Sequence, residues 1–165
     1  MDAGPVIRRA RLLALAAPAL LLAGALLFQF AGGLYPCEMC VWQRWPHVAA
    51  IGLALAAFAT RGALMRVLVF SAGVAILVSA GVALFHAGVE YGWWEGITGC
   101  ATMGGGAGRS DADILADIMA APIIRCDVAP WSLFGISLAG YNAILSGLSG
   151  AVVLLMVGKA TRSVR

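Results

Sequence analysis

The sequence predicts an all-α integral membrane protein: a bundle of four transmembrane helices with a short amphipathic helix in one loop. Of its 165 residues, 62% are hydrophobic and 12% are charged, whereas soluble domains carry about 25% charged residues. The charged residues are spaced so unevenly that four long stretches contain none or only one. Each stretch reaches the roughly 20 residues that a transmembrane helix needs, so we expect a single membrane domain over residues 1–165.

The first apolar stretch begins directly after a group of arginines, and this arrangement also resembles a secretory signal peptide. It is longer than the roughly 7 to 15 apolar residues of a signal peptide, so it is predicted to be an uncleaved span. The four spans are expected at about 12–30, 41–60, 67–85 and 133–157. They leave two loops on one side of the membrane, at 31–40 and 86–130.

The second of these loops is the only long polar segment of the chain, and it is predicted to contain the amphipathic helix. Ser110 is suited to cap the start of this helix, and Asp113 to return the hydrogen bond. Apolar residues then recur at helical spacing until Pro122 ends the pattern. A helix of this kind is suited to lie on the membrane surface.

The distribution of basic residues predicts the orientation of the bundle. Lysine and arginine close to span ends mark the cytoplasmic face of a membrane, so both termini are expected in the cytoplasm. The positive net charge of +3 follows from this asymmetry and does not indicate a nucleic-acid partner. The tails and the middle loop hold 8 of the 11 basic residues: Arg8, Arg9, Arg11, Arg61, Arg66, Lys159, Arg162 and Arg165.

All four cysteines then lie on the opposite, extracytoplasmic side. Cys37 and Cys40 form a C-x-x-C motif, whereas Cys100 and Cys126 flank the middle of the second loop. Cysteines in an oxidising compartment form disulfides, so the two pairs are expected to be redox pairs. A static disulfide between the loop cysteines is the alternative. A structural zinc site is disfavoured because only one pair has the required spacing, so neither a metal nor a flavin is predicted.

Pro36 precedes the C-x-x-C motif and places it at the N-terminal end of the second span, where the helix dipole favours a thiolate. Arg44 follows Cys40 by four residues and is expected on the same helix face, one turn deeper. A guanidinium there would stabilise a thiolate and donate hydrogen bonds to a carbonyl ligand. The alternative is an arginine that reaches back to the lipid headgroups.

Aromatic and histidine side chains near the outer face give weaker signals. Trp42 and Trp45 flank Arg44 and belong either to the aromatic belt of the membrane interface or to a pocket for a planar ligand. His86 ends the third predicted span and His47 lies one turn below Arg44. Both are expected more as polar boundary residues than as ligands, although His86 is retained as a possible ligand contact.

Taken together, these features resemble the family of the bacterial disulfide bond formation protein B, DsbB. The resemblance covers four spans, Pro36-Cys37-Glu38-Met39-Cys40 followed by Gln43-Arg44, the separated cysteines of the second loop, and the segments His86-Ala87-Gly88-Val89-Glu90 and Trp93-Trp94-Glu95-Gly96. Members of this family reoxidise the periplasmic thiol oxidase DsbA and pass the electrons to quinone. The resemblance thus implies a bacterial inner-membrane enzyme with its cysteines in the periplasm, a DsbA-like partner, and ubiquinone or menaquinone as electron acceptor.

The same resemblance implies a role for each cysteine. Cys100 would form the mixed disulfide with the partner, and Cys126 would exchange with Cys37. Cys40 would then be the thiolate that faces the quinone ring, beside Arg44. Glu38 departs from this scheme, because an acidic neighbour disfavours a thiolate.

Two other classes of protein remain as alternatives. One is an enzyme similar to vitamin K epoxide reductase, which also couples thiols to quinones, although its C-x-x-C follows the loop pair in the chain. The other, which is not an enzyme, is a haem-binding membrane protein that uses His47 and His86.

Overall fold

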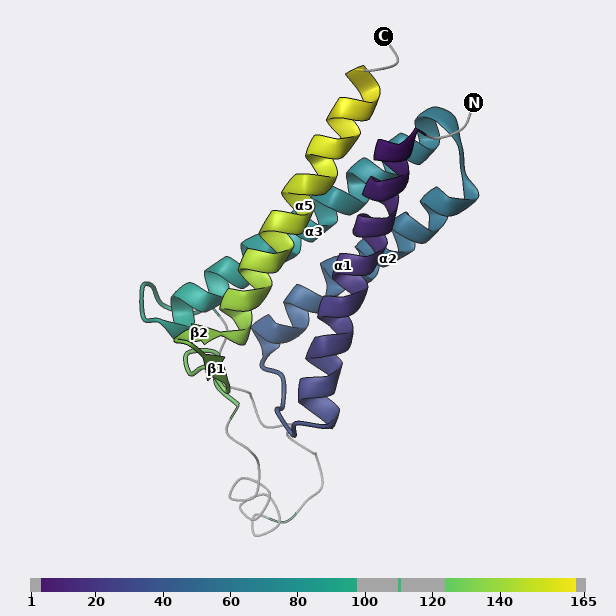
Figure 1. Cartoon of the computed structure of the whole chain (residues 1–165). Coiled ribbons are helices and arrows are strands. Elements are labelled where there is room, and N and C mark those ends of the chain that lie inside the picture. The colour runs from purple at the N-terminus through teal and green to yellow at the C-terminus, as the bar shows by residue number, and fades with distance from the viewer. Residues whose placement is uncertain (1–3, 98–109, 111–123, 163–165) are drawn as a thin grey trace.

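The computed structural model describes residues 4–97, 110 and 124–162. The four long helices of this part of the chain lie side by side in an elongated bundle, with its two described ends at the same end of the bundle (Figure 1). The predicted loop helix and Cys100 lie outside the described residues, apart from Ser110. The elements are α1 (Pro5–Phe30), α2 (Glu38–Ala59), α3 (Gly62–Glu90), β1 (Ser132–Leu133), β2 (Ile136–Ser137) and α5 (Leu138–Arg162).

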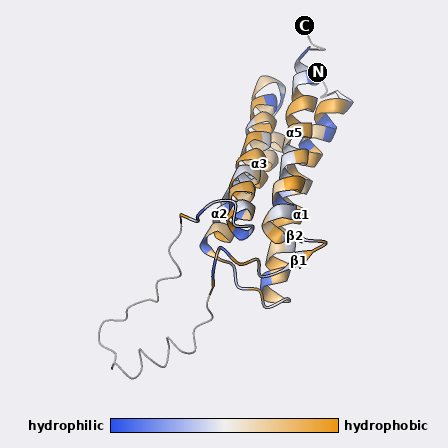
Figure 2. Ribbon diagram, turned by 90° about the vertical axis from the view of Figure 1, so that its left-hand side faces the viewer, coloured by the Kyte–Doolittle hydropathy of each residue, from blue (hydrophilic) through white to orange (hydrophobic). Residues whose placement is uncertain are grey.

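Three of these helices, α1, α3 and α5, are long and apolar enough to cross a membrane. Apolar residues run along the helices, and hydrophilic ones gather mostly at their ends (Figure 2). Many large apolar side chains, such as Leu20, Phe30 and Leu155, are exposed, as expected for helices surrounded by lipid. Helix α2 has 22 residues, and its first half carries the polar side chains of Gln43, Arg44 and His47.

The fourth helix begins later than the span predicted at 133–157. Residues 132–137 form a small antiparallel hairpin in which Ser132 pairs with Ser137 and Leu133 with Ile136. At its turn, Phe134 and Gly135 have φ angles of 50° and 78°, and two consecutive positive φ angles are typical of a tight hairpin turn. The helix itself runs from Leu138 to Arg162, so the hairpin occupies the first residues of the predicted span.

Tyr91, at the end of α3, holds this hairpin in place. Its hydroxyl donates a hydrogen bond to the carbonyl oxygen of Gly135 at 3.0 Å and accepts one from the backbone N–H of Ser137 at 2.9 Å. The hydroxyl of Ser137 then accepts from the N–H of Gly140 in the first turn of α5 at 3.0 Å. These bonds join the outer ends of α3 and α5, beside which the candidate site lies.

Glycines allow α3 and α5 to approach closely along their length. A Cβ atom built on Gly150 would lie 2.8 Å from Cγ of Leu77 and 3.2 Å from the carbonyl oxygen of Gly73. In contrast, a Cβ on Gly147 would meet only the Cβ of Ala80, at 4.0 Å. Small residues at helix interfaces let membrane helices pack closely. Here Gly150 makes the close contact with α3, whereas Gly147 does not.

We therefore expect Gly150→Ala to destabilise the bundle and Gly147→Ala to be nearly neutral. Overpacking a filled interface costs about 1 to 3 kcal/mol, since Leu77 and the backbone of Gly73 must move. Thermal unfolding of both variants in the same detergent measures the difference. Equal midpoints for the two variants would contradict the assignment of Gly150 to the closest contact.

Candidate redox site

The C-x-x-C motif lies at the beginning of α2, where the sequence predicted it. Cys37 is the N-cap residue, and its sulfur accepts a hydrogen bond from the backbone N–H of Cys40 at 3.3 Å. The thiol of Cys37 also donates to the sulfur of Cys40, with the two Sγ atoms 3.1 Å apart. The two sulfurs are therefore adjacent, with the proton placed on Cys37.

The surroundings shift the pKa values of the two thiols in opposite directions. Donating its proton to Cys40 raises the pKa of Cys37 to about 12, and burial adds to this increase. Accepting that hydrogen bond lowers the pKa of Cys40, although burial opposes the effect. Of the reduced pair, Cys40 is thus the cysteine that loses its proton more readily.

In the reduced protein, Cys40 is expected to react with an alkylating reagent at lower pH than Cys37. Because the hydrogen bond from Cys37 lowers the pKa of Cys40, Cys37→Ala should move the alkylation profile of Cys40 to higher pH. Mass spectrometry of each cysteine after short exposures across a pH series measures both profiles. An unchanged Cys40 profile in Cys37→Ala would mean that another group stabilises this thiolate.

Cys126, a cysteine of the second outer loop, lies beside Cys37. The sulfurs of Cys37 and Cys126 and a ring nitrogen of His86 all lie within 4.8 Å of one another. A structural zinc site requires four ligands, whereas thiol exchange requires only that two sulfurs meet. Ile124 and Phe85 pack around the cysteines, so this junction lies in a mainly apolar cluster at the outer end of the bundle.

His86, which the sequence placed at the outer end of the third span, is buried in the structure, with its side chain 1% exposed. Its Nε2 atom lies 3.5 Å from the sulfur of Cys37 and 3.7 Å from a carboxylate oxygen of Glu90. Its Nδ1 atom accepts a hydrogen bond of 2.8 Å from the side-chain amide of Gln43. His86 is therefore fixed beside the thiol that faces Cys126.

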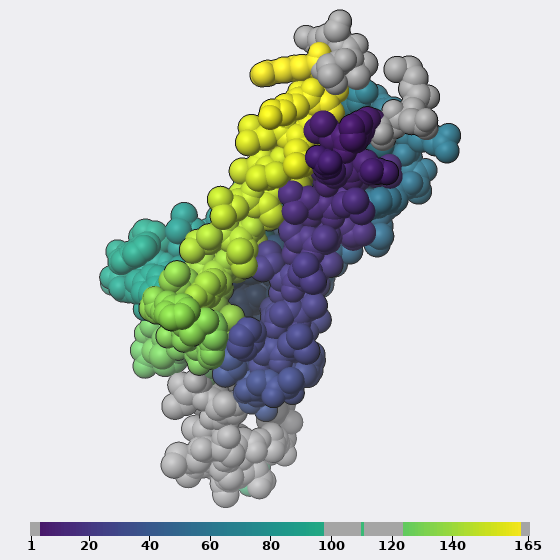
Figure 3. Space-filling view, in the orientation of Figure 1, coloured from purple at the N-terminus to yellow at the C-terminus, as the bar shows by residue number. Residues whose placement is uncertain are grey.

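On the other side of Cys40, a cavity of about 350 Å³ lies between α1, α2 and α5. The molecular surface is hollowed between α1 and α5 (Figure 3). Leu20 borders the cavity and is 73% exposed, so the cavity can be reached from the lipid side. Its lining is mainly apolar, with polar groups that include those of Tyr35, Cys40, Gln43, Arg44, His47, Glu90, Trp131, Tyr141 and Asn142.

Arg44 lines this cavity together with Cys40, one helical turn deeper, as the sequence predicted. Its Nη1 atom donates a hydrogen bond of 2.5 Å to the side-chain oxygen of Gln29 in α1. The guanidinium is therefore held at the cavity wall by a neighbouring helix, and Gln29 is a contact that the sequence did not indicate.

The structure does not bring Trp42, Trp45 or His86 into the cavity lining. Trp42 and Trp45 line a shallow depression on the outer side of α2, with Pro46 and Val78, and are 39% and 68% exposed. The aromatic rings in the cavity come from elsewhere in the sequence. They belong to Phe28, Tyr35, Trp131 and Tyr141, and the Phe28 and Trp131 ring centroids are 5.1 Å apart.

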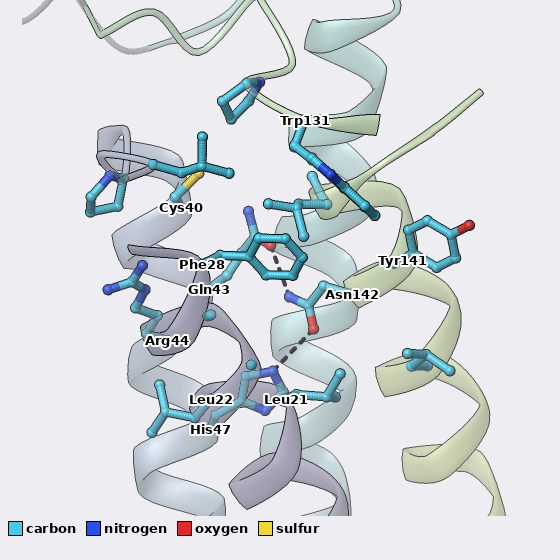
Figure 4. A pocket seen from close by; sticks show the side chains of 18 of the residues that line it. Leu21, Leu22, Phe28, Cys40, Gln43, Arg44, His47, Trp131, Tyr141 and Asn142 are labelled. Carbon is cyan, nitrogen blue, oxygen red and sulfur yellow. Dashed lines mark hydrogen bonds between the residues drawn. The ribbon is translucent and has the colours of Figure 1, made fainter. Parts of the chain in front are cut away.

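Asn142 of α5 joins α2 and the cavity in a polar network that the sequence did not reveal (Figure 4). Its side-chain nitrogen donates to the side-chain oxygen of Gln43 at 2.8 Å, and its oxygen lies 3.1 Å from Nε2 of His47. Because His47 and His86 are each bound to a different amide side chain, this arrangement does not favour a haem between them.

An apolar helical bundle with a thiolate-forming cysteine pair beside a lipid-accessible cavity defines a membrane thiol–disulfide redox protein. A family model described as disulfide bond formation protein DsbB matches residues 7–156. The match covers most of the chain, which therefore belongs to the DsbB family and is a membrane disulfide oxidoreductase. No match is found among curated proteins or among solved structures.

Proposed function

We propose that the protein reoxidises a periplasmic thioredoxin-fold dithiol oxidase of the DsbA type and passes the electrons to a membrane quinone. The reaction sustains disulfide bond formation in the periplasm. The observation that carries this proposal is the position of the C-x-x-C pair between a loop cysteine and the cavity. Cys37 meets Cys126 on one side, and Cys40 lines the lipid-accessible cavity with Arg44 on the other.

Thiol exchange accounts for the first half of the reaction. A thiolate of the reduced partner opens the Cys100–Cys126 disulfide at Cys100, and the electron pair leaves on Cys126. The Cys126 thiolate then attacks the sulfur of Cys37, the Cys37–Cys40 bond breaks, and Cys40 leaves as a thiolate. Cys40 is a good leaving group because its pKa is lowered. When the partner's second thiolate attacks the partner's own sulfur in the mixed disulfide, Cys100 leaves as a thiolate and the partner leaves with a disulfide.

Quinone suits the cavity as the acceptor substrate. Ligand pockets of about 300 to 1,000 Å³ are typically apolar with a few convergent polar groups, and this cavity has a volume of about 350 Å³ with such a lining. Quinone supplies a lipid-soluble sink for two electrons and two protons. Arg44 donates a hydrogen bond to a ring carbonyl, and its charge stabilises the Cys40 thiolate. Apolar side chains of α1 and α5 exclude water from the ring.

The charge pattern supports the placement in the membrane. Among the described residues, the basic side chains at the start of α1, at the end of α5 and around the α2–α3 connection belong to the end of the bundle that carries the termini (Figure 1). By the positive-inside rule this end is cytoplasmic, and the cysteines then face the periplasm of a bacterial inner membrane. Helix α2 is the fourth span in this arrangement, with its polar face directed towards the cavity and its apolar face towards lipid.

Anaerobic turnover of the purified, lipid-reconstituted protein tests the proposal. Reduced thioredoxin-fold oxidase and either ubiquinone or menaquinone are supplied, and quinol and oxidised partner are measured together. We expect one quinol for each partner disulfide. Cys40→Ser, which removes the leaving thiolate, serves as control and should produce no quinol and no more than one partner disulfide per chain. Partner oxidation without quinol formation would refute the role of quinone.

A further inference from the structure

His47 is a buried polar residue that the proposed reaction does not use. It is 3% exposed and lines the same cavity as Cys40 and Arg44, about two helical turns from Cys40 along α2. Its Nδ1 atom has no hydrogen-bond partner among the described residues. Buried polar groups are nearly always paired, so this atom points to a missing ligand.

The surrounding hydrogen bonds determine which ring nitrogen of His47 carries the proton. The side-chain nitrogen of Gln43 donates to the carbonyl oxygen of Met39 at 3.2 Å, which identifies it as the nitrogen of the amide. The oxygen of Gln43 must then be the atom that accepts from Asn142. Asn142 therefore presents its oxygen to Nε2 of His47, and that nitrogen must be a donor.

Ser79 leads to the same assignment independently. Its hydroxyl donates its single proton to the carbonyl oxygen of Gln43 at 2.9 Å, so it can only accept from Nε2 of His47, which lies 3.0 Å away. Neutral His47 therefore carries its proton on Nε2. Its Nδ1 atom is a bare, buried acceptor on a side chain that lines the cavity, where Arg44 can only donate.

We propose that Nδ1 of His47 accepts a hydrogen bond from a ring hydroxyl of the reduced quinone, so that the cavity binds quinol in preference to quinone. This inference rests on the proposed function and deepens it. A carbonyl oxygen brings only lone pairs to Nδ1, whereas a hydroxyl brings the proton that this atom lacks. Arg44 and His47 thus select different oxygen states: the donor binds a carbonyl and the acceptor binds a hydroxyl.

The assignment is consistent with the balance of the reaction. Cys37 and Cys40 lose two electrons and two protons as their S–S bond forms, and the acceptor gains both to become quinol. His47 has the same protonation state before and after a turnover. Its contribution is a hydrogen bond present only with the reduced ring, which favours electron transfer in the direction of quinol.

Equilibrium binding of quinone and of quinol, measured anaerobically in nanodiscs, tests this inference. The background is Cys37→Ala with Cys40→Ala, in which no electrons are exchanged. His47→Gln places an amide nitrogen where Nε2 was, so the bonds to Asn142 and Ser79 persist while Nδ1 is removed. Loss of one neutral hydrogen bond should raise the ratio of the quinol Kd to the quinone Kd about 3- to 10-fold. Ser146→Ala, which contacts only the Nε2 side, should leave the ratio unchanged.

Each alternative outcome is decisive. An unchanged ratio in His47→Gln, or an equal weakening of both ligands, would overturn the inference and assign His47 a purely structural role. A ratio that changes as much in Ser146→Ala would do the same. Absence of binding of either ligand to the background protein would instead contradict the proposed function itself.

Discussion

Cys126→Ser is expected to reduce steady-state turnover to background and to accumulate a mixed disulfide with the oxidised partner. The Cys100 thiolate of this variant can open the partner's disulfide, but the sulfur that would resolve the product is missing. In the native protein that sulfur lies with Cys37 and His86, with their ligand atoms within 4.8 Å of one another, so serine removes both the resolving thiol and the link to the C-x-x-C pair. Non-reducing electrophoresis with mass spectrometry of the crosslinked peptide identifies the trapped species.

The reciprocal variant provides the control for this trapping experiment. Cys100→Ser keeps Cys126 beside Cys37 but removes the position that the partner attacks, so it should also fail to turn over, yet without a trapped partner. Equal trapping by the two variants, or trapping through Cys37, would show that the attacked and resolving positions have been assigned wrongly.

Arg44→Ala is expected to lower kcat/KM for quinone by about 10- to 150-fold. The estimate follows from the loss of a charge-assisted hydrogen bond of about 1.5 to 3 kcal/mol. Arg44→Lys should recover only part of the loss, because an ammonium keeps the charge but lacks the planar fork. Gln29→Ala removes the group that holds the guanidinium at 2.5 Å, and it should have a smaller effect. Steady-state quinone reduction by the purified variants measures all three.

A second readout separates loss of the quinone contact from general damage. In the proposed scheme, single-turnover exchange between the partner and Cys100 does not use Arg44 or the cavity, so it should be nearly unchanged in Arg44→Ala. If quinone kinetics also remain intact, Arg44 is only an interface residue that reaches the headgroups, and the acceptor site must lie elsewhere.

The helical bundle could be predicted from the sequence because uncharged stretches of sufficient length are a strong signal for membrane helices. The position of the C-x-x-C motif and the shared face of Cys40 and Arg44 followed from local geometry alone. The start of α5 could not be predicted in the same way. Residues 132–137 are apolar enough to extend a span, but the hydrogen bonds of Tyr91 hold them in a hairpin instead.

The polar wall of the cavity could not be predicted because it depends on contacts between distant parts of the chain. Gln43 and Asn142 are separated by 99 positions, and no local pattern pairs them. For the same reason, His47 and His86 could not be distinguished from exposed boundary residues. Apolar periodicity also gave no indication that the aromatic rings of the cavity come from Trp131 and Tyr141, while Trp42 and Trp45 face outward.

The central claim is that the Cys37–Cys40 pair itself delivers electrons to quinone in the cavity beside Cys40. A double variant, Cys100→Ser with Cys126→Ser, isolates this step because the partner can no longer contribute. The variant is chemically reduced, freed of reductant and mixed anaerobically with excess quinone, and both quinol and protein thiols are counted in a single turnover. We predict one quinol and one Cys37–Cys40 disulfide per chain. Thiols that stay reduced in the presence of quinone, with no quinol formed, would contradict the account.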